Sequence, residues 1–274
     1  MNALNGTSAS SSLTGRAIVV TRPAAQAARL CRLVEGAGGE AVAFPTVEIL
    51  SIWKNNPRLA CLGASNLINY QWLIFVSPTA AAEGLVALAA GGTVPAAWPA
   101  GVAVAAVGRG TAAALSRGGL AKVVVPEVGV DSDALAALPG LQAVAIAGRR
   151  VLIVRGEGGR EWLADTLRGR GASVDVAECY RRTRPGADPA PLVARLVGGG
   201  VAGITVHSRG ALDNLLALLP AEAQAVVRAT PLFASHPRIA EHARATGLQQ
   251  VVVAGPGDDE MFKGITGFFA KVAT

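Results

Sequence analysis

Short apolar runs alternate with longer amphipathic stretches along the whole chain. Most runs are continuously apolar, which is typical of parallel strands covered by helices on both faces. After the first run, Leu30, Leu33 and Val34 share one face at helical spacing, which predicts a helix over residues 24–37. Strands are predicted at Ala17–Thr21, Trp72–Val76, Val102–Val107, Lys122–Val125, Val151–Val154, Gly203–Val206, Pro231–Ala234 and Gln250–Ala254. The pattern therefore predicts an α/β fold.

Three groups of residues recur, in the same order, in the second half of the chain. The matches pair Gly15, Arg16, Arg22, Leu30 and Gly38 with Gly148, Arg149, Arg155, Leu163 and Gly171; Ser77, Ala80 and Leu85 with Ser208, Ala211 and Leu216; and residues 119–120 and 123–125 with 247–248 and 251–253. The repeat predicts two similar parallel-sheet α/β domains with a cleft between them. Ligands of such sheets bind beyond the carboxyl ends of the strands.

The segments that follow the predicted strands are rich in glycine, hydroxyl groups and arginine. They are 21–23, 77–79, 108–111, 155–160, 207–210 and 235–238. Such segments present backbone N–H groups and helix N-termini to anions. Ordinary helix capping explains any one of them as well. Six in series favour a site for a polyanion.

Composition narrows the class of protein further. The chain of 274 residues is 51% hydrophobic and 16% charged, which excludes disorder, and its net charge is +6. It has no basic run and no aromatic stacking motif, so nucleic acid is not an expected partner. Residues 1–14 are polar and lack a signal peptide's apolar region, and the uncharged stretch 84–108 is broken by glycine and proline. We expect a cytoplasmic protein that does not enter membranes.

Groups for metal or nucleophilic chemistry are scarce. The three cysteines, Cys31, Cys61 and Cys179, are far apart, so neither a disulfide framework nor a metal site is expected. Tyr180 follows a predicted strand and could offer a hydroxyl to the cleft. An interdomain hinge residue is an equally good interpretation of this tyrosine.

Two other functions stay open at this point. Gly108-x-Gly110-x-x-Ala113 follows a predicted strand, and Glu127 lies further on, in the outline of a dinucleotide-binding oxidoreductase. The repeat argues against this interpretation, because the matching segment at His236 lacks the glycines. The second alternative is a two-domain protein that binds a small anion without catalysis.

Six segments together resemble the uroporphyrinogen-III synthase family over nearly the whole chain. They are VTRP at 20–23, IFVSPTA at 74–80, AVGRGTA at 106–112, LIVRGEGGR at 152–160, CYRR at 179–182 and VHSRGALDNLL at 206–216. One departure is His207-Ser208-Arg209, where the family commonly has Thr-Ser.

The resemblance implies a discontinuous first domain, 15–43 plus 184–274, and a second domain, 49–177. Residues 44–48 and 178–183 would form a two-stranded linker, and residues 1–14 a flexible tail. Family members are monomers of tetrapyrrole (haem, sirohaem or cobalamin) biosynthesis that use no metal or cofactor. Their substrate, hydroxymethylbilane, carries eight carboxylates. A transient contact with hydroxymethylbilane synthase is also implied.

The implied reaction is a cyclisation with loss of water. The hydroxyl leaves, ring D attacks through its substituted carbon to give a spiro intermediate, and reclosure inverts that ring. The catalytic role is expected for Tyr180, as a hydrogen-bond donor to the departing hydroxyl. Substrate binding is expected of Thr21, Arg22, Ser77, Pro78, Gly108, Thr111, Arg155, Gly156, Gly158, Gly159, Arg160, Ser208, His236 and Arg238.

Overall fold

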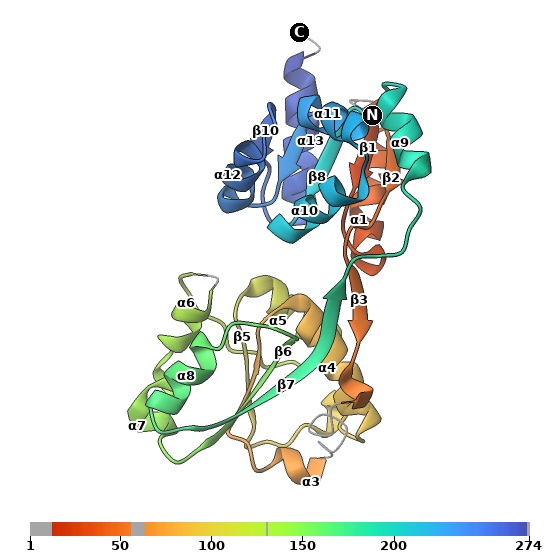
Figure 1. Ribbon diagram of the computed structural model, residues 1–274. Helices are drawn as coiled ribbons and strands as arrows, with labels where there is room; N and C mark the ends of the chain where they lie inside the picture. Colours follow the sequence, from red (N-terminus) through yellow and green to blue (C-terminus); the bar gives the residue numbers. More distant parts are fainter. Residues whose placement is uncertain (1–12, 56–63, 130, 273–274) are drawn as a thin grey trace, which may run out of the picture. The chain divides into compact units, whose positions relative to one another are not determined.

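The computed structural model describes residues 13–55, 64–129 and 131–272, which form two compact α/β units. The first contains residues up to Glu48 and from Thr183 onward, and the second spans Ile49–Arg182 (Figure 1). Most of the predicted tail lies outside the described residues. Leu13, at its end, is fully buried in the core of the first unit, which corrects the expectation for that residue.

The first unit is built on a five-stranded sheet. Its strand order is β10 (Val251–Val253), β9 (Leu232–Ala234), β8 (Gly203–Val206), β1 (Ala17–Val20) and β2 (Glu40–Ala43), and the pairings are parallel. Its helices are α1 (Ala24–Gly36), α9 (Ala190–Val197), α10 (Arg209–Leu218), α11 (Ala221–Ala229), α12 (Pro237–Ala245) and α13 (Asp258–Val272). Helices α1 and α13 pack in the core on one face, and α9 to α12 pack on the other.

The second unit contains another five-stranded sheet. Its order is β3 (Glu48–Ser51), β7 (Ser173–Thr183), β6 (Arg150–Gly156), β4 (Trp72–Phe75) and β5 (Ala103–Ala106). Its helical segments are η1 (Trp53–Asn55), α3 (Ala64–Leu67), α4 (Pro78–Ala90), η2 (Pro95–Ala97), α5 (Arg109–Arg117), α6 (Ser132–Ala136), η3 (Pro139–Leu141), α7 (Ala143–Ile146) and α8 (Trp162–Gly169). Helices α4 and α5 pack in the core on one face, and α6 to α8 pack on the other.

One predicted strand is wrong. Residues 122–125 form only a single parallel bridge, between Val124 and Ala105. Val124 donates to the Val104 carbonyl and accepts from the Ala106 amide. The next bond of the ladder would need an N–H at position 126, and Pro126 has none. The ladder therefore cannot continue past residue 125.

The sequence repeat is reproduced in the backbone. Gly15 and Gly148 both have φ of 72°, and Gly119 and Gly247 have φ of 97° and 90°. Side chains rarely adopt this left-handed conformation, so the repeat conserves glycine where each turn needs it. In strand order, β1, β2, β8 and β9 correspond to β6, β7, β4 and β5. Each half of the sequence therefore contributes strands to both sheets.

No helix in the described ranges is long and apolar enough to cross a membrane.

Candidate functional site

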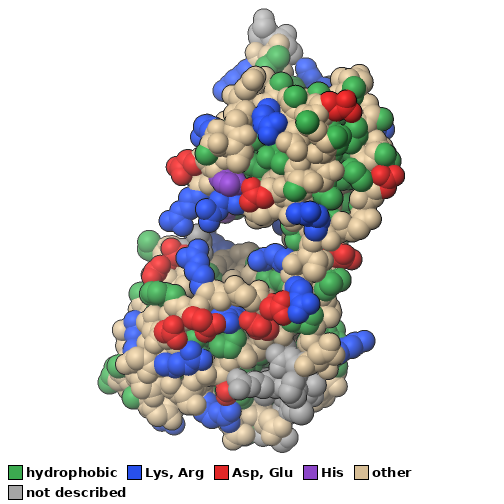
Figure 2. All heavy atoms as spheres, viewed as in Figure 1, with side chains coloured by type: hydrophobic (Ala, Val, Ile, Leu, Met, Phe, Trp, Pro, Cys, Tyr) green, Lys and Arg blue, Asp and Glu red, His purple; other side chains and the backbone are tan. Residues whose placement is uncertain are grey.

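In the first unit, two helices begin directly after neighbouring strands. Ser208 follows β8 and caps α10, where its Oγ accepts a hydrogen bond from the Ala211 amide at 3.1 Å. His236 occupies the same position before α12. Arg209 and Arg238 lie in the first turns of these helices, and both are exposed. Parallel strands end at one edge of a sheet, so this edge combines two helix N-termini with two guanidinium groups. Figure 2 shows Lys, Arg and His side chains gathered along one border of this unit.

The second unit repeats this arrangement. Ser77 follows β4 and caps α4, where its Oγ accepts from the Ala80 amide at 3.0 Å. Gly108 follows β5 and precedes α5, whose first residue, Arg109, is exposed. The matched pair predicted from the sequence, Ser77 and Ser208, therefore has the same structural role in both units. The structure brings Ser77, Pro78 and Gly108 to one edge of this sheet.

Tyr180 lies in β7 at this edge, and its side chain is only 2% exposed. Its hydroxyl is 3.2 Å from the Ser77 Oγ and accepts a hydrogen bond from Arg182 Nη2 at 2.9 Å. A Cβ atom at Gly156 would come within 2.5 Å of the Tyr180 Cζ. The glycine is therefore needed here because the tyrosine ring lies against it.

Arg155 is buried, and its charge is balanced within the protein. Its Nη2 forms ion pairs with Glu161 and, at 3.2 Å, with Glu178, while Nη1 donates to the Arg160 carbonyl at 3.1 Å. The Gly158 amide also donates to Glu178, at 3.2 Å. These contacts hold the loop that follows β6. They leave Arg160, whose side chain is exposed, as the available guanidinium of the loop.

Several other candidate residues make hydrogen bonds, ion pairs or packing contacts within their own unit. Thr21 is 1% exposed, and its hydroxyl donates to the Thr205 carbonyl at 2.6 Å. Arg22 forms an ion pair with Asp258 at the start of α13. Thr111 is buried in the first turn of α5. A Cβ at Gly159 would come 3.0 Å from the Arg155 Cδ, so this glycine is packed against the arginine stem.

His207 is a polar group that the sequence analysis did not select. It lies between β8 and Ser208, and both ring nitrogens are buried without a hydrogen-bond partner among the described residues. Burial lowers the pKa of His207 to about 3, with further contributions from Arg22 and His236. The ring is therefore neutral at pH 7, and its donor and acceptor nitrogens are buried beside this edge of the sheet.

Neither Gly108 nor Gly110 is at a position that requires glycine, as a dinucleotide-binding turn would. Gly108 is extended, with φ of −163° and ψ of 173°, which any residue can adopt. A Cβ at Gly110 would make only an ordinary contact, 3.8 Å from the Pro78 Cγ. This geometry gives no support to the dinucleotide-binding alternative.

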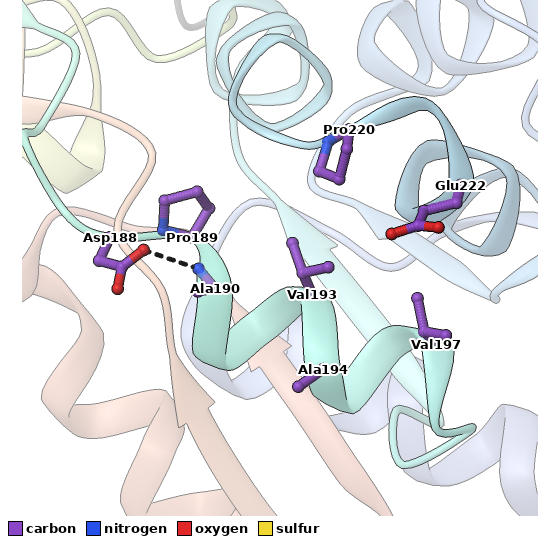
Figure 3. A pocket seen from close by; sticks show the side chains of 8 residues that line it. All are labelled: Asp188, Pro189, Ala190, Val193, Ala194, Val197, Pro220 and Glu222. Carbon is purple, nitrogen blue, oxygen red and sulfur yellow. Dashed lines mark hydrogen bonds between the residues drawn. The ribbon is translucent and has the colours of Figure 1, made fainter.

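The first unit also contains an open, largely apolar pocket of about 470 Å³ beside α9 (Figure 3). Its lining residues are Asp188, Pro189, Ala190, Val193, Ala194, Val197, Pro220 and Glu222. The charged side chains are two carboxylates, which would repel an anionic substrate. None of the candidate site residues lines the pocket.

The described cysteines, Cys31 and Cys179, are free, and Cys61 lies outside the described residues. Among the described residues, no cluster of three or more His, Cys, Asp or Glu side chains could hold a metal ion.

Arg182 is the main residue of this edge that sequence reasoning left out of the site. Its motif was recognised, but its contact with the Tyr180 hydroxyl depends on the strand carrying both side chains to one place. Arg109 and Arg209 were also omitted. Each is the first residue of its helix, and this matching position in the sequence repeat could have indicated both of them.

Comparisons with known proteins give one family. The family model described as uroporphyrinogen-III synthase HemD matches residues 28–263. Uroporphyrinogen-III synthases of Salmonella typhimurium and Escherichia coli K12 are each 34% identical over 249 residues, covering 89% of this chain and 96% of the relative.

Solved structures share the fold. A mutant uroporphyrinogen III synthase of the extremely thermophilic bacterium Thermus thermophilus aligns over 93% of this chain and 99% of its own, with a TM-score of 0.59 and 16% identity. The uroporphyrinogen-III synthetase of Helicobacter pylori 26695 aligns over 92% and 99%, with a TM-score of 0.56 and 12% identity. The predicted two-domain α/β fold is thereby confirmed. From the family model and the curated relatives, the chain belongs to the uroporphyrinogen-III synthase family.

Proposed function

We propose that this chain is a lyase that cyclises hydroxymethylbilane to uroporphyrinogen III with loss of water and inversion of ring D. The observation that carries the proposal is the pair of matched edges at Ser77 and Ser208. Each edge combines helix N-termini with exposed guanidinium groups, as a substrate with eight carboxylates requires. The enzyme's main task is then positioning, because the free bilane closes without inversion.

The carboxylates are proposed to bind to exposed groups at the two edges. In the first unit these are Ser208, His236 and Arg238, together with Arg209. His207 lies beside them, with both ring nitrogens buried. In the second unit the exposed charged group among the candidate residues is the Arg160 guanidinium. Pro78, Gly108 and Gly158 are proposed to line the edge beside it rather than to donate, since Pro78 has no N–H and the Gly158 amide is bonded to Glu178. Thr21, Thr111 and Arg155 have buried side chains, so they are proposed to stabilise the loops at the two edges rather than to contact the substrate. Gly156 and Gly159 are proposed to contribute to the site by packing against Tyr180 and Arg155. Arg22 is proposed to contribute through its ion pair with Asp258.

The proposal includes the setting of the reaction. The protein is proposed to act in the cytoplasm as a monomer, without metal or cofactor, in tetrapyrrole biosynthesis. Hydroxymethylbilane synthase is the proposed transient partner, because its product is this substrate. An interdomain hinge role for Tyr180 is less well supported than a site role, since its hydroxyl is bonded to Ser77 and Arg182.

The test uses purified protein and freshly generated hydroxymethylbilane. The products are oxidised, and the uroporphyrin isomers are separated by chromatography. Predominant isomer III is the expected result. Isomer I alone, at the rate of the enzyme-free control and with folded protein, would reject the function. In that case the next measurement would be NAD(P) binding by the purified protein, which tests the dinucleotide-binding alternative.

A further inference from the structure

Tyr180 links Arg182 and Ser77 in a hydrogen-bonded chain. A guanidinium group only donates hydrogen bonds, so the Tyr180 oxygen accepts from Arg182 at 2.9 Å. Between Tyr180 and the Ser77 Oγ, which are 3.2 Å apart, either hydroxyl can be the donor, and the tyrosine proton is free to take that role. The three groups are therefore connected so that a proton can pass from Tyr180 to Ser77 while Arg182 donates to the tyrosine oxygen.

The serine is the end of this chain. Its oxygen already accepts from the Ala80 amide at 3.0 Å, as the cap of α4. When Tyr180 is the donor, its bond fills the second acceptor site of Ser77, since a hydroxyl has two lone pairs and one proton. In that arrangement the Ser77 proton points away from both of these groups, and no acceptor for it other than the Tyr180 oxygen is recorded among the described residues.

The side chains of Tyr180 and Ser77 differ in their exposure to solvent. Tyr180 is 2% exposed and is held against Gly156, whereas Ser77 is partly exposed. A substrate at this edge therefore reaches the serine before the tyrosine. Arg182 is exposed, and no ion pair is recorded for it in the described part of the chain, so it can stabilise charge that develops on Tyr180.

We propose that Ser77 is the catalytic residue that gives its proton to the departing hydroxyl, and that Tyr180 and Arg182 are positioning residues behind it. This inference rests on the proposed function. When the C–O bond of the hydroxymethyl group breaks, the oxygen leaves with the bonding electron pair and takes the Ser77 proton, forming water. The Tyr180 proton moves to Ser77 in the same step, and Arg182 stabilises the phenolate. After ring closure, the proton lost from the pyrrole carbon returns to the chain.

The experiment measures kcat and KM for isomer III formation in Ser77→Ala, Tyr180→Phe and the double variant. Each single change is expected to lower kcat on the order of 10²-fold with little change in KM. The double variant should be no slower than the slower single variant, because residues that act as a unit are not additive. Independent, multiplying losses in the double variant would overturn the chain.

Conservative variants test the chemistry at each position. Ser77→Thr keeps a hydroxyl and should recover most of kcat, whereas Ser77→Asn keeps a cap for α4 without a hydroxyl and should not. Arg182→Lys keeps a cationic donor and should be faster than Arg182→Met. Equal rates for the threonine and asparagine variants would reject Ser77 as the proton donor.

Loss of the helix cap needs its own control. Asp131 caps α6 in the same unit, and its Oδ1 accepts from the Ala134 amide at 2.9 Å. Asp131→Ala should lower the midpoint of unfolding, as Ser77→Ala does, but leave kcat unchanged. A wild-type protein that makes no isomer III would reject the proposed function itself. A wild type that makes isomer III, with Ser77→Ala equally fast, would reject only the serine's role.

Discussion

The ring of Tyr180 lies against Gly156 so closely that no side chain fits between them. A Cβ at position 156 would be 2.5 Å from the tyrosine Cζ and 2.9 Å from its hydroxyl oxygen. The two residues are paired across β6 and β7, where the register shifts between Arg155 and Gly156. The tyrosine hydroxyl lies 3.2 Å from the Ser77 Oγ.

The first prediction concerns this contact. Gly156→Ala should displace the Tyr180 ring, destabilise the fold by about 1–3 kcal/mol through overpacking, and lower kcat. Gly169→Ala is the control, because a Cβ there meets nothing within 4 Å and its φ is not positive. Urea denaturation and the isomer assay measure both effects. Unchanged stability and rate in Gly156→Ala would contradict the close contact.

The second prediction separates two arginines of one loop. Arg155→Met removes a buried guanidinium together with its bonds to Glu161, Glu178 and the Arg160 carbonyl, and should cost about 1–2 kcal/mol of unfolding free energy, since the carboxylates left behind are partly exposed. Arg160→Met removes an exposed side chain and should change stability by less than about 0.5 kcal/mol. It should instead raise KM several-fold. If Arg160→Met destabilised the protein as much as Arg155→Met, the two roles would have been assigned wrongly.

The third prediction is a pH dependence of stability from His207. Its pKa is lowered to about 3 in the fold, mainly by burial, whereas an unfolded histidine has a pKa near 6.5. Between these values the unfolded state binds the extra proton, so stability falls as the pH decreases from about 6.5 towards 3. The loss is about 1.4 kcal/mol per pH unit, or about 2 kcal/mol at pH 5.

His207→Thr removes this contribution. Free energies of unfolding at pH 7 and pH 5 should therefore differ less in the variant than in the wild type. His242→Thr is a useful comparison, because this histidine is partly exposed and paired with Asp213. The same pH difference in wild type and His207→Thr would show that the ring does not remain neutral in the fold.

The fourth prediction concerns thiol reactivity. Burial raises the pKa of Cys179 to about 12, with Glu83 adding to the shift, and its thiol faces the Arg155 carbonyl at 3.3 Å. The nucleophile is the thiolate, so Cys179 should resist iodoacetamide at pH 8 in the folded protein. Cys31 is partly exposed and should react sooner. Peptide mass spectrometry with and without urea measures both, and equal labelling in the folded state would contradict the burial of Cys179.

Much of the fold could be read from local patterns. Continuous apolar runs predicted parallel strands, and the repeat predicted two similar units. Gly119 and Gly247 recur because each turn needs a positive φ, which is a local property of the backbone. Ser77 and Ser208 recur as helix caps for the same reason. The error at residues 122–125 was partly local, because Pro126 ends the ladder on its C-terminal side.

The candidate site depended more on tertiary structure. Arg155 and Arg160 look alike in the sequence, but only the pairing of β6 with β7 places Glu178 beside the first of them. Likewise, nothing local indicates that Tyr180 is covered while Ser77 stays accessible. By itself, the sequence determined the strands, the helix caps and the glycine turns, because these depend on neighbouring residues. The tertiary structure decided which charges are balanced and which hydroxyl can reach a substrate, because those properties depend on groups far apart along the chain.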